Sequence, residues 1–331
     1  CTGWGCRRCT SASWPATFGR MPASSRWICR ASGAPRPGPL SSQGGVAQVA
    51  HLEHVAPLGH LLGVALHHEL AVVEMGTNSP GEIARLAEIA LPDIGLITNI
   101  GPAHLEGLGS FEGIREEKGA LFQVMNGRGT AIINRDDDAV GILARRWRGD
   151  RVTFGLKSGA DITARRVETG GPEGVRFTLV IDGFEVPVRL AAPGRHNIQN
   201  ALAAGAAAWA LGIEREEIAA GLNAFCPVPG RMEIRHLENG AFVIMDTYNA
   251  NPASMREAIE TLQGLRKEGR AIAILGDMLE LGTQALELHE EIGSMLVKTG
   301  VDRVFLKGPL SRSIATGAMK KGLPKERIAY F

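Results

Sequence analysis

Residues 246–255, Asp-Thr-Tyr-Asn-Ala-Asn-Pro-Ala-Ser-Met, concentrate carboxylate, phenol and amide side chains directly after an apolar run. The run, residues 241–245, is short enough for a buried strand. Asn251 then has the position of a helix N-cap, and Pro252 that of the first residue of a helix running to residue 265. Polar side chains that follow a strand of a parallel sheet lie at the edge where α/β proteins bind ligands. The stretch therefore predicts a ligand site, with an ordinary strand-to-helix connection as the alternative.

Two other strand candidates end at residues that could hold a cation. Residues 70–73 are an apolar run that leads to Glu74, and residues 94–98 are a second run followed by a polar turn that contains His104. A carboxylate and an imidazole at neighbouring strand ends make a plausible pair of Mg²⁺ ligands, with water and phosphate completing the shell. Either side chain alone would serve equally well as a helix cap or a structural hydrogen-bonding group.

Lys118 is the third candidate, because it lies on an apolar helical stripe formed by Phe111, Ile114, Leu121, Phe122 and Met125. A lysine on the inward face of a helix is desolvated, which lowers its pKa and favours the neutral amine. A neutral amine beside a cation site can take up CO₂ and become a carbamate, an anion able to hold Mg²⁺. Periodicity alone favours the alternative, a lysine that extends its ammonium group to solvent from the edge of the stripe.

Two amides occupy the start of a later helix. Asn197 and Asn200 are one helical turn apart at the N-terminus of a segment rich in alanine and leucine that runs to residue 211. Amides in this position suit nucleobase edges or phosphate. Both could instead cap the helix.

Strands and helices alternate from residue 69 onward, which predicts the α/β class with a parallel sheet covered on both faces. Residues 151–190 instead alternate as antiparallel strands, with a tight turn at Asp182-Gly183. The proline- and glycine-rich residues 227–231 predict a hinge. We therefore expect one domain at 69–229 and a second, doubly wound domain at 230–331.

The first 68 residues differ in composition from the rest. They contain no Lys, Asp, Asn or Tyr, but four of the five cysteines and six arginines. A folded domain rarely lacks these polar residues, because turns and surfaces use them. We expect residues 1–68 to be an aberrant, poorly ordered segment that arose by wrong-frame or mis-assembled translation. The apolar ending at residues 328–331 predicts truncation at the other end.

Charge and composition narrow the class of protein. The net charge of +1 gives no electrostatic footprint for nucleic acid or an anionic membrane. The sequence has neither an apolar run long enough for a membrane span nor a signal peptide. Beyond residue 29 the only cysteine is Cys226, so the body of the chain needs no oxidising compartment. We expect a cytoplasmic monomer with no nucleic-acid partner and no membrane insertion.

Taken together, the motifs resemble the Mur ligases of bacterial cell-wall synthesis over about residues 69–331. The similarity is carried by Glu74-Met75-Gly76 and by residues 99–106, 194–200, 246–255 and 276–282. More narrowly, they are similar to the branch that adds D-alanyl-D-alanine to UDP-N-acetylmuramoyl-tripeptide. The resemblance implies a P-loop-type central ATPase domain, a Rossmann-like C-terminal domain and a UDP-binding domain before them. It also implies that ATP phosphorylates the tripeptide carboxylate before the dipeptide amine attacks the acyl phosphate.

The resemblance assigns roles to single residues. A carboxylate that attacks a polyphosphate brings anion against anion, so divalent metals must screen the transition state. Glu74 and His104 would bind Mg²⁺, and a carbamylated Lys118 would support the second ion. The remaining candidates would contact ATP or close over it: Asn197 and Asn200 at the adenine, Arg231 at the phosphates, Asp246 at the ribose, and Tyr248, Asn249 and Asn251 on the closing face of the C-terminal domain.

The sequence departs from the family at the phosphate site. The family carries a glycine-rich loop ending in Gly-Lys-Thr before the Glu74 strand, and residues 1–68 contain no such tripeptide. The UDP-binding domain is not recognisable either. We therefore expect the chain as written to have no ligase activity. The alternatives are a folylpolyglutamate synthase-like ligase, which shares the ATPase core and lysine, and a non-catalytic nucleotide-binding module.

Overall fold

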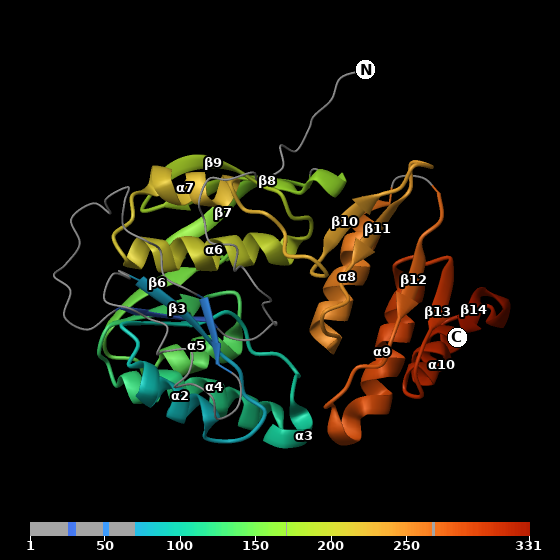
Figure 1. Ribbon diagram of the computed structural model, residues 1–331, viewed down its shortest axis with the longest axis horizontal. Helices are drawn as coiled ribbons and strands as arrows, with labels where there is room; N and C mark the ends of the chain where they lie inside the picture. The colour runs from blue at the N-terminus through green and yellow to red at the C-terminus, as the bar shows by residue number, and fades with distance from the viewer. Residues whose placement is uncertain (1–25, 31–48, 53–69, 170, 267–268) are drawn as a thin grey trace.

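The computed structural model describes residues 26–30, 49–52, 70–169, 171–266 and 269–331 (Figure 1). The expectation that residues 1–68 form an aberrant segment therefore falls largely outside the described residues. Two regions are seen in Figure 1, a large sheet with helices on both faces and a smaller C-terminal region beside it. Within the described residues, no helix is long and apolar enough to cross a membrane.

Among the described residues, nine strands form the sheet of the first region, in the order β2-β3-β1-β4-β5-β6-β7-β8-β9. Their bounds are β1 Arg26–Arg30, β2 Val49–Leu52, β3 Leu70–Met75, β4 Ile94–Ile97, β5 Thr130–Asn134, β6 Asp150–Phe154, β7 Ile162–Thr169, β8 Val175–Ile181 and β9 Phe184–Leu190. Neighbours pair in parallel from β4 to β7 and between β2 and β3. The sheet is mixed rather than purely parallel, because β1 runs antiparallel to both β3 and β4.

The antiparallel segment predicted at residues 151–190 is confirmed for β7 to β9, but its first residues form β6, which pairs in parallel with β5. Strands β7, β8 and β9 pair antiparallel, and Ile181 lies opposite Phe184 across a two-residue turn. Asp182 and Gly183 both have positive φ, 48° and 80°. Two such residues form the turn that follows the natural twist of a hairpin, and Asp-Gly adopts it readily.

Helices cover both faces of the central sheet (Figure 1). One face carries α2 Glu82–Ala90, α4 Phe111–Met125 and α5 Asp138–Ala144, with the short α3 Leu105–Leu108 at its edge; the other carries α6 Arg195–Ala210 and α7 Arg215–Asn223. Strand β5 shows why its sequence is a continuous apolar run. Ala131 and Ile133 pack with α4 and α5, while Ile132 packs with α6 on the opposite side. A parallel strand buried on both faces needs apolar residues at successive positions.

The C-terminal region contains a hairpin and a separate parallel sheet. Strands β10 Glu233–His236 and β11 Phe242–Met245 pair antiparallel, and β12 Ile272–Leu275, β13 Arg303–Leu306 and β14 Ile328–Tyr330 pair in parallel. The helices are α8 Pro252–Leu265, α9 Ala285–Lys298 and α10 Ser311–Lys320. Strand–helix alternation with a parallel sheet agrees with the predicted Rossmann-like class.

The sequence interpretation of residues 241–245 is wrong in one respect. Strand β11 belongs to the two-stranded hairpin and not to a parallel sheet, and Val243 is 41% exposed. The reason is the turn at Gly240, whose φ of 82° brings the preceding strand alongside β11. The predicted start and end of the following helix are confirmed. Asn251 accepts a hydrogen bond from the Ser254 N–H, Pro252 is the first residue, and α8 ends at Leu265.

A buried carboxylate, Glu117, fixes the loop between β3 and α2. Its oxygens accept hydrogen bonds from the N–H of Gly81 at 2.6 Å, the N–H of Ile83 at 2.7 Å and the hydroxyl of Thr77 at 3.1 Å. Helix α4 is thereby bound to the chain that directly follows β3. Because Glu117 precedes Lys118, this attachment also sets the position of that lysine relative to the strand ends.

We expect Glu117→Ala to lower the free energy of unfolding by about 3 kcal/mol, because it leaves two main-chain N–H groups without their acceptor. Urea unfolding followed by circular dichroism measures the change. Glu116→Ala is the matched control, since Glu116 is exposed on the same helix, and it should change stability by less than about 0.5 kcal/mol. Equal losses in the two variants would show that the Glu117 contacts do not stabilise the fold.

Candidate functional site

Lys118 lies buried at the carboxyl edge of the central sheet. Its side chain extends from α4, the residue is 6% exposed, and Nζ donates a hydrogen bond to the carbonyl oxygen of Asn99 at 3.2 Å. Burial lowers the lysine pKa from 10.5 to about 8, although the nearby charge of Asp137 acts in the opposite direction. Periodicity alone favoured a lysine extended to solvent, and that interpretation is wrong, because the structure has the inward placement. An amine with this pKa is partly neutral near physiological pH.

Asp137 links two strand ends beside Lys118. It is the N-cap of α5, where Oδ1 accepts from the N–H of Val140 at 2.9 Å. Its other oxygen, Oδ2, accepts from the N–H of Ile100 at 2.8 Å. The residue therefore joins the end of β5 to the loop that follows β4. Sequence reasoning missed Asp137, although Asp136 and Asp137 follow the apolar strand at 130–134 just as Glu74 follows its own.

Glu74 and His104 occupy two more strand ends at this edge. Glu74 lies near the end of β3 and is 2% exposed. His104 is the N-cap of α3, and its Nδ1 lies 2.6 Å from Oε2 of Glu280 in the C-terminal region. Within the described parts of the chain, His, Cys, Asp and Glu side chains do not gather in threes into a set able to hold a metal ion.

The amides at the start of α6 make local hydrogen bonds but do not cap the helix, whose N-cap is Gly194. Asn197 donates from Nδ2 to the carbonyl oxygen of Pro193 at 2.7 Å, and its Oδ1 accepts from Nδ2 of Asn200 at 3.4 Å. Asn200 is exposed. Gln199, between them, donates to Asp136 at 3.1 Å. The helix start is thereby attached to the strand edge that holds Lys118.

Asp136 is a second acidic residue that sequence reasoning missed. Its oxygens accept from the N–H groups of Leu156 at 2.7 Å and Lys157 at 2.8 Å, besides the Gln199 amide. Burial acts to raise the pKa of Asp136, but these hydrogen bonds and the Lys157 charge outweigh it, so the pKa lies below its usual value. Asp136 is thus ionised, and its hydrogen bonds join the end of β5 to the loop after β6 and to α6.

A second group of predicted residues gathers after the hinge. The guanidinium of Arg231 lies over the ring of Tyr248, 4.0 Å from its centroid. Asp246 accepts from the N–H of Met232 at 3.2 Å. Burial raises the pKa of Asp246, while the charges of His196 and Arg231 act to lower it. A cation, a phenol and a half-buried carboxylate therefore converge beside the start of α6.

The other two predicted residues of the closing face are used locally. The Oδ1 atom of Asn249 accepts from the N–H of Ala250 at 2.8 Å, and Asn249 is exposed. The side chain of Asn251 caps α8 through Ser254. Asn249 is therefore exposed with its side-chain oxygen bonded locally, whereas the side-chain oxygen of Asn251 caps the helix.

Helix α8 packs the C-terminal region against the start of α6. Nδ1 of His196 lies 3.2 Å from Oε2 of Glu257. A side chain at Gly194 would come within 2.8 Å of the Thr261 hydroxyl, so the close approach of the two helices needs glycine there. We call the boundary between the two regions the seam; it is crossed by the His104–Glu280 and His196–Glu257 contacts. Glu74 and Lys118 lie buried within the central region.

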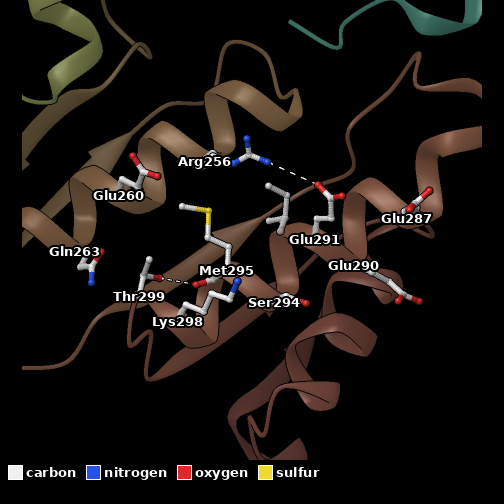
Figure 2. A pocket seen from close by; sticks show the side chains of 11 residues that line it. Arg256, Glu260, Gln263, Glu287, Glu290, Glu291, Ser294, Met295, Lys298 and Thr299 are labelled. Carbon is white, nitrogen blue, oxygen red and sulfur yellow. Dashed lines mark hydrogen bonds and ion pairs between the residues drawn. The ribbon is translucent and has the colours of Figure 1, made fainter. Parts of the chain in front are cut away.

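A groove of about 850 Å³ lies elsewhere, between α8 and α9 (Figure 2). Its lining mixes acids and bases, and Arg256 pairs with Glu291 at 3.7 Å. None of the predicted site residues lines it. We therefore regard the groove as a solvated space between two helices and not as part of the seam.

The lowered pKa of Lys118 predicts a pH-dependent stability. Because the folded pKa lies below the unfolded one, the folded chain gains stability as the pH rises from about 8 towards 10.5. Burying the charged amine of Lys118 destabilises the folded chain by about 3 kcal/mol at neutral pH. The hydrogen bond from Lys118 to Asn99 offsets about 1 kcal/mol of this cost. We expect Lys118→Met to be more stable by roughly 2 kcal/mol at pH 7, with the difference vanishing near pH 10.

Urea unfolding of both proteins at four pH values between 7 and 10 measures this difference. The control is Lys321→Met, because Lys321 is exposed after α10 and should give a difference that does not change over this range. A Lys118→Met variant that is less stable at pH 7, with no trend in pH, would contradict the burial of a charged amine.

Two family models match this chain, one in each of the two regions. Residues 51–208 match the family model of the Mur ligase middle domain, and residues 230–331 match that of the Mur ligase glutamate ligase domain. The curated UDP-N-acetylmuramoyl-tripeptide--D-alanyl-D-alanine ligase of Bacillus subtilis is 36% identical over 273 residues, covering 82% of this chain and 58% of the relative. The enzyme of the same name from Escherichia coli is 35% identical over 264 residues, covering 78% and 57%. The chain spans a little over half the length of these relatives.

This chain is also similar to solved structures of enzymes from this family. The crystal structure of MurF from Acinetobacter baumannii has a TM-score of 0.75 at 32% identity, covering 83% of this chain and 58% of that one. MurF ligase from Thermotoga maritima in complex with ADP has a TM-score of 0.69 at 26% identity, covering 86% and 69%. A folylpolyglutamate synthase from Thermotoga maritima has a TM-score of 0.53 at 19% identity, with 79% and 58% covered, and this likeness concerns the fold alone.

Proposed function

The chain belongs to the Mur ligase family, and on that basis we propose that it carries the ATP-using and closing parts of a ligase. The reaction would join D-alanyl-D-alanine to UDP-N-acetylmuramoyl-tripeptide in peptidoglycan synthesis. Relatives at 33 to 36% identity from several bacteria share the name of this enzyme. The structural observation that supports the proposal most is the buried amine of Lys118, held at the strand edge beside Asn99.

The donor chemistry at this edge fits magnesium only if Lys118 changes its chemical form. Glu74 supplies a carboxylate and His104 an imidazole, but a neutral amine offers Mg²⁺ no oxygen. A carbamate formed from CO₂ and Lys118 would supply two. We therefore propose that Glu74, His104 and carbamylated Lys118 hold Mg²⁺. When bound, the ions would screen the negative charge of the ATP phosphates and of the attacking carboxylate.

The seam supplies the remaining contacts in this proposal. Asn197 and Asn200 would contact the adenine of ATP from the start of α6, and Asp246 the ribose. Arg231 would contact the phosphates, with Tyr248 holding its guanidinium in place from one face. Asn249 and Asn251 would line the surface that closes over the nucleotide. Docking the C-terminal region would bring the two reacting groups together and exclude water between them.

The proposed order of reaction follows from charge. The terminal carboxylate of the tripeptide takes the γ-phosphoryl group of ATP and becomes an acyl phosphate, and ADP leaves. The dipeptide amine then attacks the acyl carbon, and phosphate departs with the pair of electrons from the C–O bond.

We propose domains at residues 69–229 and 230–331. The family match that begins at residue 230 supports the start of the second domain. We also propose that the protein is a monomer and acts in the cytoplasm.

Nucleotide binding tests the proposed use of α6. We expect Asn200→Ala to weaken binding of ADP with Mg²⁺ about tenfold, the loss of one hydrogen bond of roughly 1.4 kcal/mol. Isothermal titration calorimetry measures the dissociation constant. Gln263→Ala is the matched control, because this exposed amide lines the groove of Figure 2 and should leave binding unchanged. Weaker binding in the control but not in Asn200→Ala would place the nucleotide elsewhere.

A turnover assay tests whether the lack of a Gly-Lys-Thr phosphate loop in residues 1–68 abolishes ligase activity. Residues 1–68 contain no lysine to reach the β- and γ-phosphates, so we expect the 331-residue chain to form no pentapeptide from ATP, the tripeptide nucleotide and D-alanyl-D-alanine. Chromatography of the reaction mixture checks this. Product that depends on D-alanyl-D-alanine would refute the expected inactivity, and turnover that depends on glutamate and a folate would favour the folylpolyglutamate synthase alternative.

A further inference from the structure

A carboxylate of the C-terminal region reaches His104 across the seam. Oε2 of Glu280 lies 2.6 Å from Nδ1 of His104, and the carbonyl oxygen of Glu280 accepts from the N–H of Glu106 at 3.3 Å. Gly282, with φ of 57°, lies so close that a Cβ there would be 3.5 Å from Cα of Glu106. Figure 1 shows the result, with α3 beside the start of α9. Residues 280–282 therefore dock onto the turn that carries His104.

The 2.6 Å contact between Nδ1 and a carboxylate oxygen is the geometry of an Nδ1–H donor to Glu280. In that tautomer the other ring nitrogen, Nε2, would keep the lone pair that a cation needs. Histidines that ligate metals almost always donate their second ring nitrogen to a carboxylate, a carbonyl or water, which sets both tautomer and ring orientation. The His104–Glu280 pair has this arrangement.

Main-chain geometry holds both partners in place. His104 has φ of 57° and Glu280 has φ of 61°, in the left-handed region that few residues other than glycine adopt. Such conformations persist where the surrounding fold imposes them, and they cluster at sites that need a fixed direction. The two side chains are 29% and 53% exposed, so as a surface ion pair the contact adds little to stability. Its effect is therefore on orientation.

We propose that Glu280 is a positioning residue, which holds His104 as the Nδ1–H tautomer with Nε2 directed at a divalent cation. Because Glu280 comes from the C-terminal region and His104 from the central one, the cation site is complete only when the two regions are docked. The inference rests on the proposed function, in which His104 is a cation ligand. It gives a role to residues 276–282, which the proposed function leaves without one.

Binding of Mn²⁺ in the presence of saturating ADP tests the inference on the full chain, with free Mn²⁺ counted by electron paramagnetic resonance. Removing an outer-shell partner of a metal-bound histidine lowers metal affinity by about 10- to 100-fold. We expect this loss in Glu280→Ala and a smaller one in Glu280→Gln, which retains an acceptor. Glu287→Ala, an exposed carboxylate of α9, is the control and should bind as the unsubstituted chain does.

The double variant separates positioning from a second, independent ligand. If Glu280 acts through His104, the combination of His104→Ala with Glu280→Ala binds Mn²⁺ no more weakly than His104→Ala alone. Where His104→Ala does not fold, His104→Gln takes its place. Unchanged affinity in Glu280→Ala, with a loss in the His104 variants, would overturn the role of Glu280 and leave the proposed function standing. Unchanged affinity in the His104 variants would refute the cation role of His104 and the inference together.

The tautomer itself gives a readout that a purely structural contact would not move. Nitrogen-15 NMR of the labelled chain distinguishes a protonated Nδ1 from a protonated Nε2, and comparison with the His104 variant assigns the signal. We expect the Nδ1–H form alone in the unsubstituted chain and a mixture of both in Glu280→Ala. The same single tautomer in both proteins would overturn the inference.

Discussion

The site depends on one desolvated amine. Lys118 lies on the buried face of α4 and its nitrogen donates to the carbonyl oxygen of Asn99; burial disfavours its charged form, so its pKa falls to about 8. Two neighbours keep it there. Glu117 binds α4 to the chain after β3, and Asp137 binds the end of β5 to the loop after β4. Glu117 and Asp137 thus fix the chain after β3, β4 and β5 beside the helix that carries Lys118.

The second half of the site comes from residues that follow the hinge. Arg231, Tyr248 and Asp246 meet beside the start of α6, and α8 packs against the same place through Glu257 and Thr261. In the proposed function the central region supplies the groups for phosphate and cation, and the C-terminal region those that cover them. Docking of the two regions would then be needed to exclude water from the reacting groups.

Local patterns predicted the parts of the structure that depend on local physics. Asn251 with Pro252 predicted the start of α8, because a cap is set by residues within a few positions. The helical stripe around Lys118 left two placements open, and periodicity alone favoured the exposed one, which is wrong. Pairings between distant segments were not predictable in this way. Strand β1 lies antiparallel between β3 and β4, since strand order depends on which distant segments meet. The β10–β11 pairing is local, and the Asn239-Gly240 turn between the two strands is a hairpin signal that could have been used. Glu280 is 176 residues from His104, and no spacing rule relates them. Asp137 could have been found by the strand-end rule that identified Glu74.

Carbon-13 NMR of the chain with labelled bicarbonate and Mg²⁺ tests the central claim most directly, because a carbamate on Lys118 places the label on a single buried nitrogen. The account predicts one carbamate signal that grows as the pH rises through about 8, persists in Lys321→Arg and is lost in Lys118→Arg. No carbamate signal at any pH, or one that survives the replacement of Lys118, would contradict it.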